Sequence, residues 1–270
     1  MFFLFASCGS ETSIIRIKGS DTEVNLTVAL AESFSDFDDK TLISVSGGGS
    51  GLGITSLFNG NADIANSSRE LNADEINRFL NAQKNIIQHV FAYDVLAFVV
   101  SNQSDIDSID LDHLKKVLNG EIKNWQELNP KLSSNINIYG RQSNSGTFEY
   151  LKKTLDIQFS PFAKQMNGNA QIMEAVQADP TGIGYVSIGF LTSNPNHRLK
   201  ALSIKKETSQ KAISPLDESA VMKGDYFFSR PLFQFFDAKD SSKVKPFIEF
   251  EKSEKASKII KTFGYFQNIK

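Results

Sequence analysis

The stretch TLISVSGGGSGLGITSLFNGN, residues 41–61, sets the fold class of this chain. Its first part, residues 41–47, is rich in β-branched and apolar residues and predicts a strand, and residues 53–61 predict a short helix. Between them, five glycines occupy seven positions from Gly47 to Gly53. Glycine loses more conformational freedom on folding than any other residue. The loop therefore implies either left-handed backbone angles or the very close approach of another group.

The same strand–turn–helix pattern recurs along the chain. Residues 14–34 read as a strand, a tight turn and a helix, and residues 135–155 repeat that order. Strands that alternate with helices predict an α/β fold with mainly parallel sheets and right-handed crossovers. Two long apolar segments, near residues 90–100 and 226–236, are longer than average strands. We expect the chain to pass between two lobes at these segments.

Composition excludes several classes of protein. The chain has 270 residues, of which 40% are hydrophobic, and a formal net charge of -2. This length suits one large domain or two smaller ones. A slightly acidic chain without a basic cluster does not suit general nucleic-acid binding, and we expect no nucleic-acid partner. No stretch approaches the roughly 20 apolar residues of a membrane-spanning helix.

The single cysteine lies in a distinctive context. In MFFLFASC, residues 1–8, a short apolar run and two small residues precede Cys8. This pattern is typical of the end of a bacterial lipoprotein signal, although the run is shorter than a complete signal peptide. We expect residues 1–8 to be a residual lipoprotein signal and Cys8 to be lipidated. The alternative is a truncated N-terminus with an incidental thiol.

Four polar turns carry the chemistry of the sequence, namely residues 19–22, 47–53, 66–70 and 141–147. In parallel α/β sheets such turns gather at one edge, where ligands bind. Helix N-termini there favour anions, and Arg141 adds a planar cationic donor suited to phosphate or carboxylate. Taken alone, the glycine loop could be a packing feature, and it lacks the signatures of dinucleotide and P-loop nucleotide binding. Together the four turns predict an oxyanion site.

Nothing in the sequence predicts a metal site or a cofactor. His89, His113 and His197 are far apart and none is near the cysteine. The acidic run at residues 105–113 lacks the glycine and the final glutamate of a calcium-binding loop.

Six segments of the sequence resemble one known family. They are IKGSDTEVNL (17–26), SGGGSGLGITSLFNGNADIANSSRE (46–70), AYDVLAFVVS (92–101), GEIKNWQEL (120–128), YGRQSNSGTFEYL (139–151) and GIGYVSIGFL (182–191). In this order they resemble PstS, the phosphate-binding proteins of bacterial phosphate ABC importers, over nearly the whole chain. The R-x-x-x-S-G-T motif that begins at Arg141 and the segment DIANSSR are the most specific matches.

The resemblance implies a two-lobed periplasmic binding protein fold of type II, in which a hinge joins two α/β lobes that close on one dehydrated phosphate. We expect lobe one to comprise residues 9–95 and 232–270, and lobe two residues 96–231. The resemblance also implies a monomeric binding protein and not an enzyme, anchored in the periplasm through its lipid, which hands inorganic phosphate to membrane ABC permease subunits. The implied phosphate-binding residues are Ser20, Asp21, Thr22, Ser50, Gly51, Ser68, Arg141, Ser145, Gly146 and Thr147.

One position departs from the family. Some members carry an aspartate, which accepts a hydrogen bond from protonated phosphate, where this chain has Ser68. Such a carboxylate distinguishes phosphate from sulfate, because sulfate carries no proton near neutral pH. Our hypothesis is that Asp21 takes this acceptor role. The alternative is that Asp21 only caps the helix that begins near Glu23.

Two other functions fit the same turns. The chain could bind another oxyanion, such as sulfate or molybdate. A phosphatase could use the same anion cradle, but it would need a metal cluster or an activated nucleophile with a nearby base.

Overall fold

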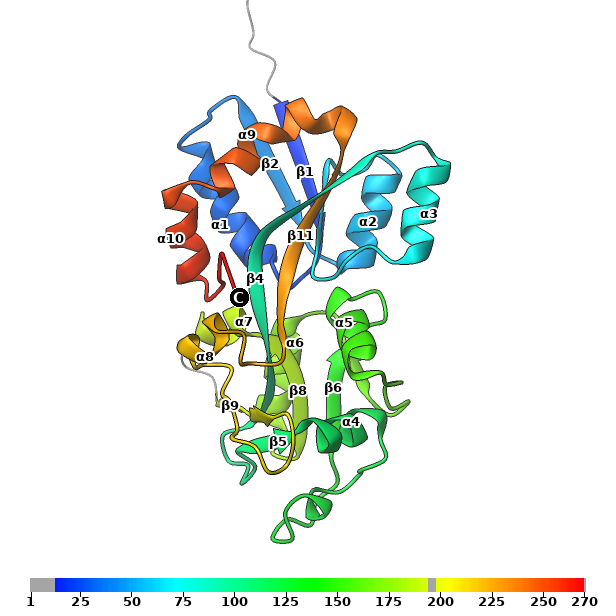
Figure 1. Cartoon of the computed structure of the whole chain (residues 1–270), viewed down its shortest axis with the longest axis vertical. Coiled ribbons are helices and arrows are strands. Elements are labelled where there is room, and N and C mark those ends of the chain that lie inside the picture. Colours follow the sequence, from blue (N-terminus) through cyan, green and yellow to red (C-terminus); the bar gives the residue numbers. More distant parts are fainter. Residues whose placement is uncertain (1–12, 194–197, 270) are drawn as a thin grey trace, which may run out of the picture.

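The computed structural model describes residues 13–193 and 198–269, which fold into two lobes stacked along the long axis of the molecule (Figure 1). The predicted signal remnant with Cys8, and His197, lie outside these ranges. In the described part of the chain, no helix is both long and apolar enough to cross a membrane.

The strands are β1 (Ser13–Gly19), β2 (Thr41–Ser46), β3 (Ile64–Ser67), β4 (Ile86–Ser101), β5 (Ser108–Asp110), β6 (Asn137–Arg141), β7 (Lys164–Met166), β8 (Gly182–Ser187), β9 (Leu199–Ala201), β10 (Ser203–Lys205) and β11 (Ser229–Asp237). The helices are α1 (Val24–Ser35), α2 (Ser50–Phe58), α3 (Ala73–Asn81), α4 (Leu111–Asn119), α5 (Gly146–Leu155), α6 (Asn169–Ala178), α7 (Ile188–Thr192), α8 (Glu218–Met222), α9 (Ser241–Glu251) and α10 (Glu254–Thr262). Two short 3-10 helices are η1 (Trp125–Glu127) and η2 (Ala238–Asp240).

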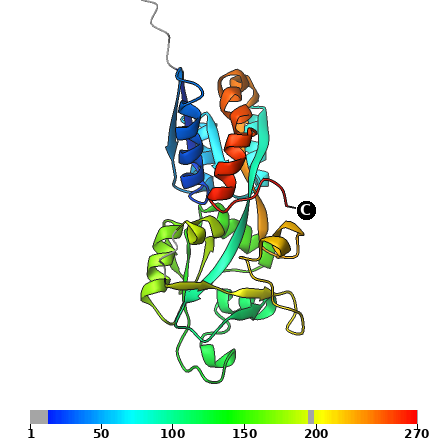
Figure 2. The same cartoon turned by 90° about the vertical axis from the view of Figure 1, so that its left-hand side faces the viewer.

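The first lobe is built on a sheet in the order β2-β1-β3-β11-β4. Strand β1 runs parallel to both β2 and β3, whereas β11 is antiparallel to β3 and β4. Adjacent residues of β3 point to opposite faces of this sheet, as the pleat requires. Ile64 packs with α1, α9 and α10, and Ala65 packs with α2 and α3 (Figures 1 and 2). The sheet is therefore covered by helices on both faces.

The second lobe continues from the other half of β4. Its sheet runs β4-β8-β6-β7, with β9 also paired to β4, and β6 is parallel to both β7 and β8. A separate small sheet pairs β5 with β10. One large core of aliphatic and aromatic side chains fills this lobe, including Trp125 and Tyr185. The carboxyl end of β6 points toward the first lobe (Figure 1).

Strand β4 joins the lobes. Residues 86–95 pair with β11, and from Leu96 onward the same strand pairs with β8. Register slips between Leu232 and Phe233, which marks a β-bulge close to this crossing point. The sequence-based expectation that the apolar segment near residues 90–100 passes between the lobes is confirmed. The exact limits of each lobe stay a prediction.

Two local features differ from the sequence-based expectations. Helix α2 begins at Ser50, so the second half of the glycine run is already helical and not part of a loop. Helix α1 has Glu23 at its N-cap, without a side-chain cap bond. Neither helix has a side-chain cap bond at its N-terminus.

Candidate functional site

The glycine run serves both purposes that the sequence suggested. Gly48 and Gly49 have φ angles of 129° and 102°, in the region that favours glycine. Gly53 packs against β1, where an added Cβ would lie 2.4 Å from the carbonyl oxygen of Lys18. The loop is thus shaped by its backbone angles and pressed onto the neighbouring strand.

A loop from the second lobe touches this glycine run. The Gly51 N–H donates to the carbonyl oxygen of Asn144 at 3.1 Å, and the Asn144 side-chain amide donates to the carbonyl oxygen of Gly48 at 3.2 Å. A Cβ on Gly49 would lie 2.9 Å from the Asn144 oxygen. The glycines therefore allow the two lobes to approach each other at backbone distance.

The start of helix α5 meets the start of helix α2 at this contact. Ser145 is the N-cap of α5, and its hydroxyl accepts a hydrogen bond from the Thr147 N–H at 3.2 Å. Gly146 lies so close to the first lobe that an added Cβ would be 2.2 Å from Ser50 Oγ and 2.6 Å from Ser68 Oγ. Two helix N-termini, each with the partial positive charge of a helix start, thus face one small volume.

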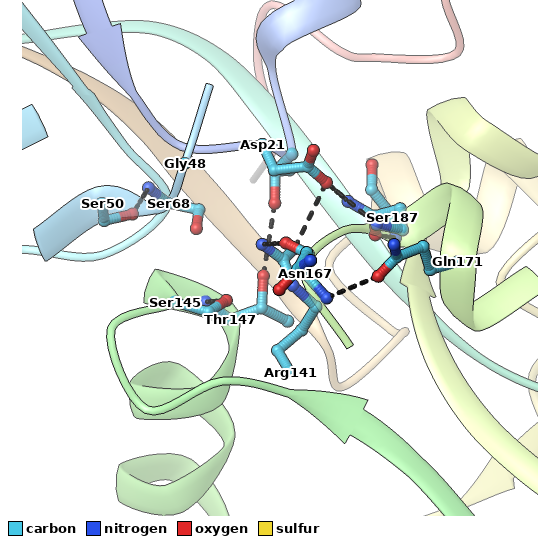
Figure 3. A network of polar contacts seen from close by, with 12 residues as sticks. Asp21, Gly48, Ser50, Ser68, Arg141, Ser145, Thr147, Asn167, Gln171 and Ser187 are labelled. Atoms are coloured by element: carbon cyan, nitrogen blue, oxygen red, sulfur yellow. Dashed lines mark hydrogen bonds and ion pairs between the residues drawn. The ribbon is translucent and has the colours of Figure 1, made fainter. Parts of the chain in front are cut away.

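Ser50 and Ser68 bring hydroxyl groups to the same place (Figure 3). The Ser68 N–H donates to Ser50 Oγ at 3.1 Å, and both residues are buried. Ser68 Oγ itself has no hydrogen-bond partner in the described structure. A buried hydroxyl without a partner is unfavourable, so this oxygen is suited to donating its proton to a ligand.

Arg141 supplies the cation predicted from the sequence. Its side chain is only 3% exposed. One terminal nitrogen donates to the carbonyl oxygen of Asn167 at 2.9 Å, and the other lies 3.4 Å from Asp21 Oδ2 (Figure 3). Its Nε is buried and has no hydrogen-bond partner among the residues that the structure describes. Burial lowers the pKa of Arg141, because the interior disfavours its charge, and Asp21 opposes that effect. A second anion beside this guanidinium would be favourable.

Asp21 connects the lobes in a way that the sequence did not indicate. Its Oδ2 accepts hydrogen bonds from the backbone N–H and the side-chain amide of Asn169, at 2.9 and 2.7 Å. Asn169 is the first residue of α6, so Asp21 caps a helix of the opposite lobe and not α1. The alternative that Asp21 only caps α1 is therefore wrong. The acceptor hypothesis for Asp21 stays a prediction.

Two further buried residues complete the contacts, and sequence reasoning missed both. Arg230 of β11 bonds Asp94 of β4 at 2.8 Å and also lies 3.0 Å from Thr147 Oγ1. Thr147 Oγ1 is in turn 3.2 Å from Thr22 Oγ1. The sequence did contain an indication of this pair, because Asp94 and Arg230 each interrupt a long apolar segment. Charged side chains buried in such segments are usually paired.

Glu23 lies in the same buried region. Both of its carboxylate oxygens are buried. Burial raises the pKa of Glu23 well above its usual value, and the positive charge of Arg230 only partly offsets this.

The residues predicted for the site come together where the two lobes touch. Ser20 is buried beside the end of β3, where its N–H donates to the carbonyl oxygen of Asn66 at 3.0 Å. The other predicted residues contribute the contacts described above. Their role in holding a ligand stays a prediction. Hydrogen bonds connect the turn at residues 19–22 to the turns at 66–70 and 141–147, and the turn at 47–53 to that at 141–147. Within residues 13–193 and 198–269, no cluster of three or more His, Cys, Asp or Glu side chains could hold a metal ion.

Comparison with known proteins places this arrangement in a family. A family model described as the PBP superfamily domain matches residues 6–255. The phosphate-binding protein PstS of Borreliella burgdorferi is 28% identical over 262 residues, which cover 93% of this chain and 89% of the relative. PstS of Staphylococcus saprophyticus is 25% identical, over 92% of this chain and 77% of the relative.

Solved structures agree on the architecture. An ABC-type phosphate transport receptor from Vibrio cholerae superposes with a TM-score of 0.73 at 27% identity, over 94% of this chain and all of that one. A substrate-binding protein with bound phosphate from Clostridium perfringens superposes with a TM-score of 0.83 at 21% identity, over 95% of this chain and 100% of that chain. These matches confirm the expected α/β fold in two lobes. The chain therefore belongs to the family described as the PBP superfamily domain.

Proposed function

We propose that this chain is an extracytoplasmic solute-binding protein that captures inorganic phosphate between its lobes and delivers it to a membrane ABC permease. One observation carries the proposal. Two hydrogen-bond donors of the described structure, Ser68 Oγ and Arg141 Nε, are buried without partners, and Ser68 Oγ lies where the N-termini of α2 and α5 meet. Relatives named as phosphate-binding proteins support the choice of anion.

The proposed ligand contacts come from both lobes. Ser20, Asp21, Thr22, Ser50, Gly51 and Ser68 would act from the first lobe, and Arg141, Ser145, Gly146 and Thr147 from the second. An anion that bonds both sets is held only when the lobes are together. Phosphate would therefore favour the closed arrangement by the contacts that it gains there.

We propose binding without catalysis. Apart from the carboxylate of Asp21, the proposed anion contacts are hydrogen-bond donors, and a binding role needs no nucleophile activated by a base. The chain would use no cofactor and would act as a monomer. Its membrane attachment would be a lipid on Cys8, and mass spectrometry of the chain recovered from native membranes would detect that modification.

The first test is a calorimetric titration of the purified chain with phosphate, arsenate and sulfate. We expect tight binding of one phosphate per chain, comparable binding of arsenate and much weaker binding of sulfate. Equal affinity for phosphate and sulfate would contradict the proposed ligand.

Selectivity is proposed to depend on Asp21. We expect Asp21→Asn to reduce the difference between the phosphate and sulfate affinities. An asparagine amide has no negative charge to repel sulfate, and its NH2 group can donate a hydrogen bond to a fully ionised anion. Asp74→Asn is a matched control, since Asp74 is exposed on α3 away from the site. If Asp21→Asn leaves the ratio of the two affinities unchanged, Asp21 does not discriminate between the anions.

A further inference from the structure

Arg230 and Asp94 form a fully buried ion pair beside the crossing point of the two lobes. The two residues face each other across β11 and β4. Both Nε and Nη2 of Arg230 donate to Asp94 Oδ2, at 3.1 and 2.8 Å. Their side chains are 2% and 0% exposed. A pair buried this deeply is costly to desolvate, and a hydrophobic pair would often be as stable. Stability alone is therefore a weak reason for it.

The guanidinium of Arg230 also reaches the proposed anion site. Its Nη2 lies 3.0 Å from Thr147 Oγ1 and 3.4 Å from Thr22 Oγ1. Its Nη1 lies 3.4 Å from the carbonyl oxygen of Ser68. One side chain thus touches the turn after β1, the turn after β3 and the start of α5. These contacts come from both lobes.

The direction of these hydrogen bonds matters. A guanidinium can only donate, so a threonine hydroxyl that accepts from Arg230 keeps its own proton for another acceptor. The hydroxyls of Thr22 and Thr147 lie 3.2 Å apart, so at most one of them can donate to the other. At least one hydroxyl proton is then available to an anion. The positive charge behind the hydroxyls would also favour that anion in surroundings of low dielectric.

We infer that Arg230 is a positioning residue for the anion, which orients the hydroxyls of Thr22 and Thr147 as donors and adds a second positive charge behind them. Asp94 holds the guanidinium in place for this task. The inference rests on the proposed function, since it concerns the same site.

Asp94 is itself fixed by the network around the site. Ser187 Oγ donates to Asp94 Oδ1 at 2.6 Å, and the Ser187 N–H donates to the side-chain oxygen of Asn169 at 3.0 Å. Asn169 in turn bonds Asp21, which faces Arg141. The two arginines are thus linked by a chain of hydrogen bonds that crosses between the lobes.

The test compares two charge-neutral pairs of substitutions by calorimetric titration with inorganic phosphate. Arg230→Gln with Asp94→Asn removes both charges together, so that no lone charge stays buried. The control is Arg16→Gln with Asp63→Asn, which removes a more exposed ion pair of 3.1 Å in the first lobe outside the site and also the contact of Lys243 with Asp63. We expect the Arg230/Asp94 variant to bind phosphate about 10- to 100-fold more weakly, the effect of losing charge-assisted hydrogen bonds. The control should stay within about threefold of the wild type.

A double-mutant cycle separates positioning from simple support of the fold. Thr147→Val is added to the wild type and to the Arg230/Asp94 variant. If Arg230 acts through Thr147, the loss of affinity caused by Thr147→Val is smaller in the variant than in the wild type. Strictly additive losses overturn the positioning role, even where the melting temperatures of all variants are normal.

The single substitution Arg230→Lys provides a second variant that keeps a charge beside Asp94. A lysine is a point charge and cannot bond Asp94 and both hydroxyls as a planar fork does, so we expect weaker phosphate binding here too. Wild-type phosphate affinity in Arg230→Lys, or in the Arg230/Asp94 variant, overturns the inference and leaves the proposed function intact. Failure of the wild-type chain to bind phosphate overturns both.

Discussion

Arg141 combines features that are unfavourable unless an anion is nearby. It is almost fully buried, its Nε has no partner, and its nearest charge, Asp21, lies 3.4 Å away. We expect Arg141→Ala to weaken phosphate binding by at least about 100-fold, since it removes charge-assisted hydrogen bonds to the ligand. Calorimetry measures the affinity, and thermal unfolding shows that the variant stays folded.

Arg78→Ala is the control for that experiment. Arg78 lies on α3 and stacks over Phe58 at 3.9 Å, away from the site. It should bind phosphate as the wild type does. Wild-type affinity in Arg141→Ala would break the assignment of Arg141.

At the residue scale, the sequence predicts side chains near the turns better than side chains inside strands. Arg141 and Ser145 are recognisable because they stand in polar turns before helices, where ligands commonly bind. Arg230 and Asp94 lie within apolar segments, and their pairing depends on the register of β11 against β4. That register is a long-range property, so neither residue could be assigned to the site before the strands were placed.

At the scale of elements, Glu251 at the end of α9 is packed against the middle of β11. Gln234 Nε2 donates to Glu251 Oε1 at 2.8 Å, whereas in the described structure Glu251 Oε2 has no hydrogen-bond partner and lies 3.9 Å from His89 Nε2. Burial raises the pKa of Glu251 to about 8. His89, the cross-strand neighbour of Gln234, offers little compensation, because burial lowers its pKa and favours its neutral form.

This pairing of elements predicts a pH-dependent stability. Between the usual glutamate pKa of 4.5 and about 8, the folded state holds a proton on Glu251 that the unfolded state has lost. The free energy of unfolding therefore falls as the pH rises through this range. We expect Glu251→Gln, which stays neutral, to be more stable than the wild type at pH 8.5, by at most about 5 kcal/mol. The two proteins should differ little near pH 5.

Denaturant unfolding at both pH values measures the effect. Glu249→Gln, an exposed change on the same helix, is the control and should give a small difference at either pH. A stability difference between Glu251→Gln and the wild type that does not change with pH would contradict a proton held on Glu251.

The elements themselves were largely predictable, since strand and helix patterns alternate clearly in the sequence. The start of α2 was not. Glycine has poor intrinsic helix propensity, so a helix that includes Gly51 and Gly53 is disfavoured locally. It forms because Gly53 packs closely on β1 and Gly51 bonds Asn144 of the other lobe. Tertiary contacts override the local preference here.

At the scale of the whole molecule, Gly146 makes the close approach of the lobes possible. A Cβ at this position would collide with Ser50 and Ser68 of the first lobe, but it would suit the first turn of α5. We expect Gly146→Ala to hold the lobes apart and to weaken phosphate binding at least about 100-fold, without loss of stability in the absence of phosphate. Small-angle scattering should then show no decrease of the radius of gyration on addition of phosphate, in contrast to the wild type.

Gly47→Ala is the matched control in the same part of the molecule. A Cβ on Gly47 would meet the Val24 side chain, with Cγ2 at an ordinary 3.7 Å. It should bind phosphate and compact as the wild type does. If Gly146→Ala also compacts and binds normally, closure does not depend on the contact between α5 and the two serines.

The place of β11 in the first lobe has a consequence for biosynthesis. This strand lies between β3 and β4, yet the ribosome makes it after almost the whole second lobe. Until it arrives, β3 has an unpaired edge, and such edges in incomplete sheets promote aggregation. The second lobe can therefore fold before the first lobe, whose sheet is complete only after β11 has been synthesised. The segment that emerges first is therefore the one that most needs protection from aggregation during synthesis.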